Sequence, residues 1–296
     1  MAVLNYAVQY SQALAQAFPY VLNFGDLYAT PNNGRYKVTG AKTIEIPVIS
    51  TTGRVDGDRD TITMATRNFD NSWEPKVLVN HRKWSTLVHP MDIDQTNLVA
   101  SISNITQVYN QEQKFPEMDA YTVSKIYADW AALGKTADTT ALTAANILTV
   151  FDQLMQAMTE KRVPGTGRIL YVTPAVETLL KNASGVTRSI NIQNGGNEWN
   201  RMVAGLDMVK IVVVPPDLMQ TLYDFTAGWK AASTAKQINL FLVHPLAVIT
   251  PVNYQFAQLD APSAMTEGKW VYFEEAFEDV FLLNNKADAI AFNMEA

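Results

Sequence analysis

The sequence contains no cysteine, so disulfide bonds, thiolate metal sites and a cysteine nucleophile are all excluded. Histidine is scarce as well, because only His81, His89 and His244 are present and none has the HxH or HExxH spacing of a metal-binding pair. Basic residues number 23 against 29 acidic ones, which gives a net charge of -6. This balance argues against a sequence-reading nucleic-acid protein, because such proteins present a broadly basic surface to the phosphate backbone.

The sequence also lacks an apolar run long enough to cross a membrane. The most apolar stretch, residues 238–252, is shorter than the roughly 20 residues that a spanning helix needs, and prolines interrupt it. The first residues, MAVLNYAVQYSQALAQAF, have neither the basic region nor the solid apolar run of a signal peptide. We therefore expect a soluble protein. With 48% hydrophobic and 18% charged residues over 296 positions, it can bury a substantial core in two or more lobes.

Apolar residues recur at helical spacing in four segments, residues 4–18, 98–109, 123–133 and 147–158. Phe115 and Pro116 are expected to interrupt the helical structure between the second and third of these segments. Gly134 stands where a C-cap glycine belongs, directly after the third. Buried strands are predicted at residues 168–173 and 208–214, and the sequence from residue 238 onward is predicted to be mostly β-strand. The fold class is therefore α+β, with an exposed Asn- and Gly-rich loop at residues 185–202.

Between residues 41 and 90, two segments with the sequence pattern of β-strands flank a large polar segment. Ile44, Ile46 and Val48 alternate with other residues at the period of a strand with one apolar face, and Pro47 is typical of an edge strand. Residues 77–88 are a second β-rich run, so we predict a long hairpin-like extension. A two-stranded ribbon is marginal alone in water. Its apolar residues, including Trp84, should therefore be covered by another part of the protein or by another subunit.

The polar tip of this extension contains the stretch RVDGDRD, whose Asp56, Asp58 and Asp60 match the first, third and fifth ligand positions of an EF-hand calcium loop. The motif also requires a glycine and a glutamate further along, and Thr61 and Arg67 occupy those positions. We interpret the stretch as a solvated charged turn and predict no metal site.

Four carboxylates near the C-terminus, Glu274, Glu275, Glu278 and Asp279, could supply an acid/base pair for glycoside hydrolysis. Acidic residues that alternate with aromatic ones in β-rich text more often form a polar face or pair with basic groups. We predict no catalytic residues and no cofactor. The absence of a catalytic constellation from a chain of this size favours a structural role.

The order of these parts resembles that of the major capsid proteins of tailed bacteriophages, which share the Hong Kong 97 fold. The resemblance lies in the N-terminal arm, the long β extension, MDIDQTN opening a long helix, FPEMDAY, a helix-rich lobe and the closing segment WVYFEEAFEDVFLLNNKADAIAF. It covers nearly the whole chain. It implies an N-arm at residues 1–40 and an E-loop hairpin at residues 41–90. A P-domain with a spine helix would comprise residues 91–134 and 246–296, and an A-domain would comprise residues 135–245.

The resemblance implies a non-enzymatic protein that assembles with itself through hexamers and pentamers into an icosahedral virion shell around double-stranded DNA. Assembly would take place in the host bacterial cytoplasm. Contact with the packaged DNA would be non-specific, and the partners would include scaffold, portal and decoration proteins. The residues implied to contact a neighbouring subunit from the E-loop are Ile44, Ile46, Val48, Arg54, Asp56, Asp58, Arg59, Asp60 and Trp84.

Two alternatives remain open at this point. An encapsulin-like shell protein of a bacterial nanocompartment has the same fold but encloses enzymes instead of DNA. A carbohydrate-acting enzyme that uses Glu274 and Glu278 belongs to a different class, and loss of turnover on mutating these residues would identify it.

Overall fold

The computed structural model describes residues 20–40, 42–54, 56, 67–96, 100–183 and 205–296. The predicted helix at residues 4–18 and nearly all of the Asn- and Gly-rich loop at 185–202 lie outside these residues, as do Leu98, Asp58, Arg59 and Asp60. The α-helices are α1 Gly25–Tyr28, α2 Pro90–Gln95, α3 Ile102–Tyr109, α4 Phe115–Ala132, α5 Ile147–Glu160 and α6 Pro174–Asn182. Together with the strands described below, they confirm the α+β class.

A five-stranded sheet forms the centre of the body, in the order β15-β10-β5-β7-β6. Its strands are β5 Ile169–Val172, β6 Gly205–Leu206, β7 Val209–Val213, β10 Ile238–Val243 and β15 Ile290–Met294. Every residue of β5 is buried, as predicted for this run of apolar side chains. The sheet is mixed, because β5 and β7 are parallel whereas β10 pairs with its neighbours in antiparallel fashion.

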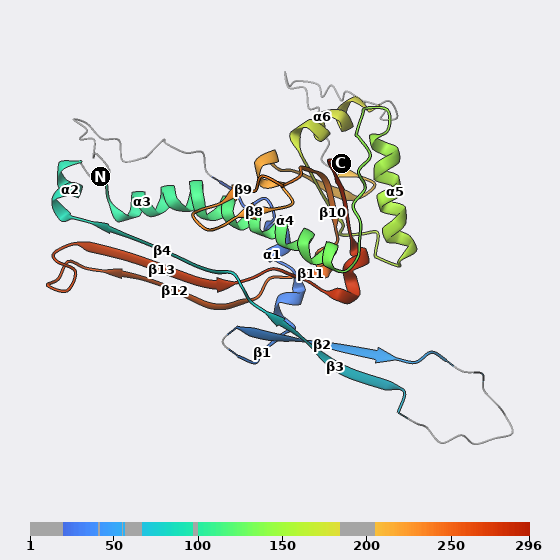
Figure 1. The fold of residues 1–296 in the computed structure, drawn as a ribbon, viewed down its shortest axis with the longest axis horizontal. Helices are drawn as coiled ribbons and strands as arrows, with labels where there is room; N and C mark the ends of the chain where they lie inside the picture. The colour runs from blue at the N-terminus through green and yellow to red at the C-terminus, as the bar shows by residue number, and fades with distance from the viewer. Residues whose placement is uncertain (1–19, 41, 55, 57–66, 97–99, 184–204) are drawn as a thin grey trace, which may run out of the picture.

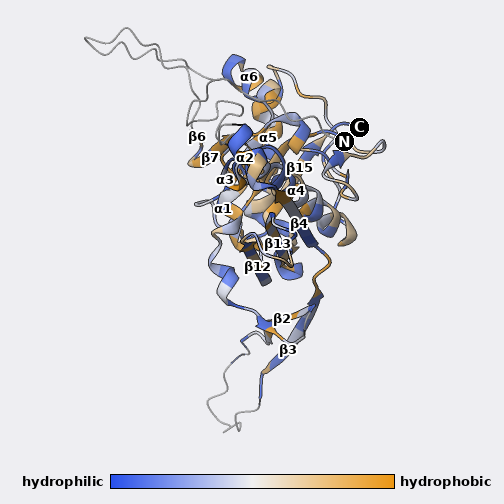
Figure 2. Ribbon diagram, turned by 90° about the vertical axis from the view of Figure 1, so that its left-hand side faces the viewer, coloured by the Kyte–Doolittle hydropathy of each residue, from blue (hydrophilic) through white to orange (hydrophobic). Residues whose placement is uncertain are grey.

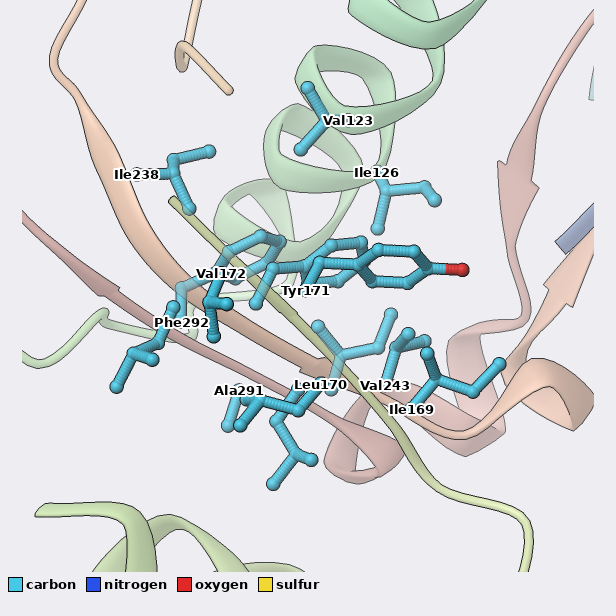
Figure 3. Packing of buried hydrophobic residues seen from close by; sticks show 14 of the residues in the cluster. Val123, Ile126, Ile169, Leu170, Tyr171, Val172, Ile238, Val243, Ala291 and Phe292 are labelled. Atoms are coloured by element: carbon cyan, nitrogen blue, oxygen red, sulfur yellow. The ribbon is translucent and has the colours of Figure 1, made fainter. Parts of the chain in front are cut away.

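Aromatic rings fill the core beside this sheet. The Phe241 ring centroid lies 4.6 Å from that of Phe292 and 5.5 Å from that of Tyr171. Val123 and Ile126 point from α4 toward Tyr171 (Figure 3). The predicted helix at residues 123–133 therefore exists because its apolar face packs on this sheet. Gly134, with φ of 75°, ends it as predicted.

One long helix runs from Ile102 to Ala132, because α3 continues through a π-helical turn, Asn110–Lys114, directly into α4 (Figure 1). The predicted break at Phe115 and Pro116 is wrong. Proline in a helix lacks an N–H donor, and its ring crowds the carbonyl four residues earlier, here that of Glu112. The wider π-turn lies at this carbonyl and accommodates the proline without ending the helix.

A three-stranded antiparallel sheet runs beside this helix, in the order β12-β13-β4 (Figure 1). Its strands are β4 His81–Val88, β12 Val252–Asp260 and β13 Trp270–Glu278. Trp84 of β4 stacks on Tyr109 of the long helix with 3.9 Å between ring centroids. Trp84 therefore does not lie on the projecting hairpin, and its cover comes from its own chain. The prediction that residues 77–88 form the second strand of the hairpin is wrong, because β4 pairs with β13 instead.

The projecting hairpin consists of β2 Thr43–Thr51 and β3 Phe69–Val77, with the short strand β1 Lys37–Val38 on the other side of β2. The pairing of β2 with β3 is continuous from Thr43 opposite Val77 to Thr51 opposite Phe69. We call β2 and β3 together the arm. It extends away from the body in Figures 1 and 2. Two further short pairs, β8 Tyr223–Asp224 with β9 Lys230–Ala231 and β11 Val248–Ile249 with β14 Phe281–Leu282, complete the strands.

The segment before α1 is bound to the long helix by one buried carboxylate. Asp119 accepts hydrogen bonds from the backbone N–H groups of Asn23 and Phe24, at 2.9 and 3.2 Å, and from the hydroxyl of Tyr20. Burial raises the pKa of the Asp119 carboxyl, and these hydrogen bonds oppose that rise. This contact fixes where the N-terminal part of the chain meets the body.

Candidate functional site

The arm has two faces that differ in their environment. Because side chains alternate along a strand, Ile44, Ile46 and Val48 share one face of β2. At the root of the arm this face lies on the body, where Ile44 and Ile46 are buried among Leu78, Ile249, Phe277, Phe281 and Leu283. Of the two kinds of cover expected for this face, from the same chain or from another subunit, these two isoleucines have the first. Val48, one step further out, is half-buried.

The opposite face of the arm is largely left in solvent by the described residues. Ile49 is 69% exposed, Trp73 48% and Val77 57%, and Phe69 is exposed beside them. Trp73 stands opposite Pro47 in the register and so belongs to the same face as Ile49. We call Pro47, Ile49, Phe69, Trp73 and Val77 the outer arm face. Exposed apolar residues that gather on one surface are typical of an interaction site.

Sequence reasoning missed this outer arm face. Phe69 and Trp73 belong to the segment FDNSWEPKV. This segment contains mainly polar residues, which favours the prediction of a loop. The signal that could have identified it is the alternation of Phe69, Asn71, Trp73, Pro75 and Val77, of which four are apolar. The regular alternation of Ile44, Ile46 and Val48 instead marked the face that packs on the body.

The charged residues predicted at the tip of the arm are only partly described. Arg54 and Asp56 are exposed, whereas Asp58, Arg59 and Asp60 lie outside the described residues. Where β3 begins, Arg67 and Asp70 form an ion pair at 3.9 Å with both side chains in solvent. Exposed pairs of this kind contribute about 0 to 1 kcal/mol, so they can set the register of a contact more than its strength.

A second exposed apolar surface lies on the β12-β13-β4 sheet, on the side away from the long helix. Tyr254 and Phe256 of β12 are exposed and have ring centroids 6.5 Å apart, and Phe273 of β13 lies 6.2 Å from Phe256. Leu87 of β4 is exposed on the same side of the sheet. The chain thus has two strand surfaces on which aromatic rings meet solvent.

The four C-terminal carboxylates do not converge on one site. Glu275 pairs with His81 on the outer side of the sheet, whereas Glu274 lies on the helix side with Lys114 Nζ 3.1 Å away. Asp279 is buried and accepts hydrogen bonds from Tyr121 Oη and from the Val79 and Val280 N–H groups, which makes it a structural residue.

Burial raises the pKa of the Glu278 carboxyl. A raised pKa is what a general acid requires. The cavity that Glu278 lines together with Glu274 measures only about 40 Å³, however, whereas sites for small organic ligands typically measure about 300–1,000 Å³. The geometry therefore offers no cleft for a saccharide at the residues of the enzymatic alternative.

Two of the histidines form hydrogen bonds with their own neighbouring backbone. His89 and His244 each accept a hydrogen bond from a backbone N–H two residues later, which begins a helical turn. Burial lowers the pKa of His244. Across the described residues, no group of three or more histidine and acidic side chains is placed to hold a metal ion. Within that same part of the chain, no helix combines the length and apolar character needed to cross a bilayer.

No protein-family model matches the chain, and no curated protein matches it either. Solved structures do match over nearly its full length. The protein from Mycobacterium phage Che8 is 12% identical, with a TM-score of 0.64, 99% of this chain covered and 98% of the other. The bacteriophage PhiM1 mature capsid is 12% identical, with a TM-score of 0.69 and coverage of 99% and 92%. The capsid of the cyanophage P-SCSP1u is 13% identical, with a TM-score of 0.65 and coverage of 98% and 93%.

Identities this low establish shape only. The match in shape extends over the arm, the long helix and the body together, because each alignment includes at least 98% of this chain. The resemblance inferred from the order of sequence elements is thereby confirmed at the level of fold. The chain has the fold of tailed-phage capsid proteins, the Hong Kong 97 fold.

Proposed function

We propose that this chain is the major capsid protein of a tailed bacteriophage, which assembles through hexamers and pentamers into an icosahedral shell around double-stranded DNA. The observation that carries the proposal is the full-length match in fold to phage capsids. The outer arm face adds independent support, because Ile49 and Trp73 are still 69% and 48% exposed in the described part of the chain and a second copy could cover them.

In such a capsid protein the chain divides into four regions. The arm is the E-loop, now limited to β2 and β3 with the segment between them, and β4 joins the P-domain because it pairs with β13. The long helix is the spine helix of that domain. The five-stranded sheet with α5 and α6 is the A-domain, and residues 1–40 form the N-arm. Many modest contacts per copy, repeated around closed rings, would then give a stable shell.

Electron microscopy of the purified recombinant protein tests this function. We expect hollow icosahedral particles or rings of six. A protein that stays monomeric at every concentration, with turnover of a saccharide, would contradict the proposal. Particles that copurify with a bacterial enzyme, from a gene with no terminase or portal gene beside it, would instead identify a nanocompartment shell.

The role of the outer arm face is tested by the double variant Ile49→Asp/Trp73→Asp. Both side chains are exposed, so we expect the free energy of unfolding to change by at most about 0.5 kcal/mol per site. Particle yield should fall at least about tenfold, because charge would be buried at each contact between copies. The matched control Ile49→Val/Trp73→Phe keeps both sites apolar and should assemble. Normal particles from the aspartate variant would show that this face is not an assembly contact.

A further inference from the structure

A cavity of about 140 Å³ lies at the root of the arm, between the arm and the body. Ile46, Val48 and Glu74 of the arm form one wall of it. Arg35, from the segment that follows α1, and Lys286, from the connection between β14 and β15, belong to the other wall. Any group that occupies this cavity therefore touches the arm and the body at the same time.

The body side of the cavity is positively charged and lacks a carboxylate to balance it. Arg35 is exposed, and no acidic side chain of the described residues pairs with it. Lys286 Nζ donates one hydrogen bond, to the carbonyl of Leu246 at 3.0 Å, which leaves the other protons of the ammonium group for a further acceptor. Burial and the nearby Arg35 both lower the pKa of Lys286.

The carboxylate of Glu74 also lines the cavity and forms an ion pair within the arm, although its buried Oε1 accepts no hydrogen bond. Glu74 Oε1 lies 2.8 Å from Lys76 Nζ, and the same ammonium group donates to Asn284 Oδ1 at 2.9 Å. Lys76 therefore neutralises Glu74 on the arm side. Arg35 and Lys286 remain as two like charges on the body wall of a space that the described residues do not fill.

We propose that this cavity binds an oxyanion, and that in the assembled protein the oxyanion is a side-chain carboxylate of a second copy of the chain. A guanidinium group matches a carboxylate with two parallel hydrogen bonds, and an ammonium group adds a third donor. The volume of about 140 Å³ is close to that of a cavity that holds benzene, so a carboxylate or a phosphate group fits inside it. The chain carries 29 acidic and 23 basic residues, so each copy has carboxylates in excess to offer to a neighbour.

The consequence is a link between assembly and the direction of the arm. An oxyanion bound by Arg35 and Lys286 removes their mutual repulsion and lies against the arm wall that Ile46 and Val48 form. The occupant then limits how closely the arm can approach the body once a neighbour is in place. The occupant named here rests on the proposed shell function, whereas the oxyanion site itself does not.

The site is tested first on unassembled protein, in the Ile49→Asp/Trp73→Asp background if the native chain assembles. Inorganic phosphate and acetate are titrated at constant ionic strength against chloride, and the amide NMR signals of Glu74 and Asn285 are followed. We expect saturable shifts, with affinity at least about tenfold weaker in Arg35→Gln and in Lys286→Gln. Lys236→Gln, which removes an exposed lysine elsewhere, should bind as the parent does. Equal affinity in all of these proteins would overturn the site.

The occupant is tested by assembly. If a carboxylate of a second copy fills the cavity, saturating phosphate should slow particle formation of the native chain and leave the Arg35→Gln variant unaffected. Assembly that does not respond to phosphate would overturn this occupant. Weaker binding of a short DNA duplex by Arg35→Gln and Lys286→Gln, in place of slower assembly, would identify a nucleic-acid phosphate instead. The titration needs no shell, so its failure is distinct from a failure of the proposed function.

Discussion

The five-stranded body and the arm both carry apolar side chains on their strands, but they differ in how far these side chains are buried. In the body, β5 is buried along its whole length and Phe241, Phe292 and Tyr171 pack on one another. In the arm, one face is buried only at the root, and the other keeps an isoleucine and a tryptophan in solvent. The difference teaches that the body buries its apolar residues within its own chain, whereas the described residues leave the outer arm face in solvent, which is why we propose a second copy as its cover.

The largest expected effect comes from the body. Phe241→Ala should reduce the free energy of unfolding by about 3–5 kcal/mol, because it leaves a cavity beside three aromatic rings. Phe69→Ala on the outer arm face removes the same side chain from an exposed position and should change stability by at most about 0.5 kcal/mol. Urea denaturation followed by circular dichroism measures both. Equal losses in the two variants would abolish the contrast between body and arm.

A smaller and more local effect is expected at the arm root. Ile44→Ala removes a fully buried side chain from the contact with the body, and should weaken that contact by about 2–4 kcal/mol. Ile49→Ala, in the same strand but exposed, should cost less than about 0.5 kcal/mol. Hydrogen exchange resolves this locally, because the Leu78 N–H donates to the Lys42 carbonyl at the arm root. If both variants leave the exchange of this amide unchanged, the arm root is not held by Ile44.

The smallest effect concerns the carboxylate that binds the N-terminal segment to the body. The folded pKa of Asp119 is raised above its ordinary value of 3.8, so the folded protein holds this proton more tightly than the unfolded chain. The stability that results is fully present below pH 3.8 and is lost as the pH rises through the raised folded pKa. Urea unfolding from pH 3 to 7 should show this decline in the native chain relative to Asp119→Asn, whose amide does not titrate.

Asp119→Asn should also cost about 1–3 kcal/mol at all pH values, because an amide NH₂ group replaces one accepting oxygen. The control Asp152→Asn changes an exposed residue of α5 and should leave the pH profile as it is. A native profile that stays parallel to that of Asp119→Asn would contradict the raised pKa.

The sequence predicted an element correctly where the pattern that specifies the element lies within its own residues. The helix α5 and the strand β5 were predicted from local apolar spacing, and Gly134 marked the end of α4 because a left-handed residue is required there. The prediction failed where a partner distant in sequence decides the outcome. β4 was assigned to the arm because its text is β-rich, and only its pairing with β13, nearly two hundred residues away in sequence, places it in the body.

The sequence by itself determined the α+β class, the absence of thiol chemistry, the main helices and the existence of a projecting hairpin. Only the tertiary structure decided which face of that hairpin meets solvent. The alternation of Ile44, Ile46 and Val48 shows that one face of β2 is apolar, but alternation cannot say what lies against it. The body covers that face at its root and leaves Ile49 and Trp73 exposed, because burial depends on packing between segments far apart in the chain, and local periodicity does not record such packing.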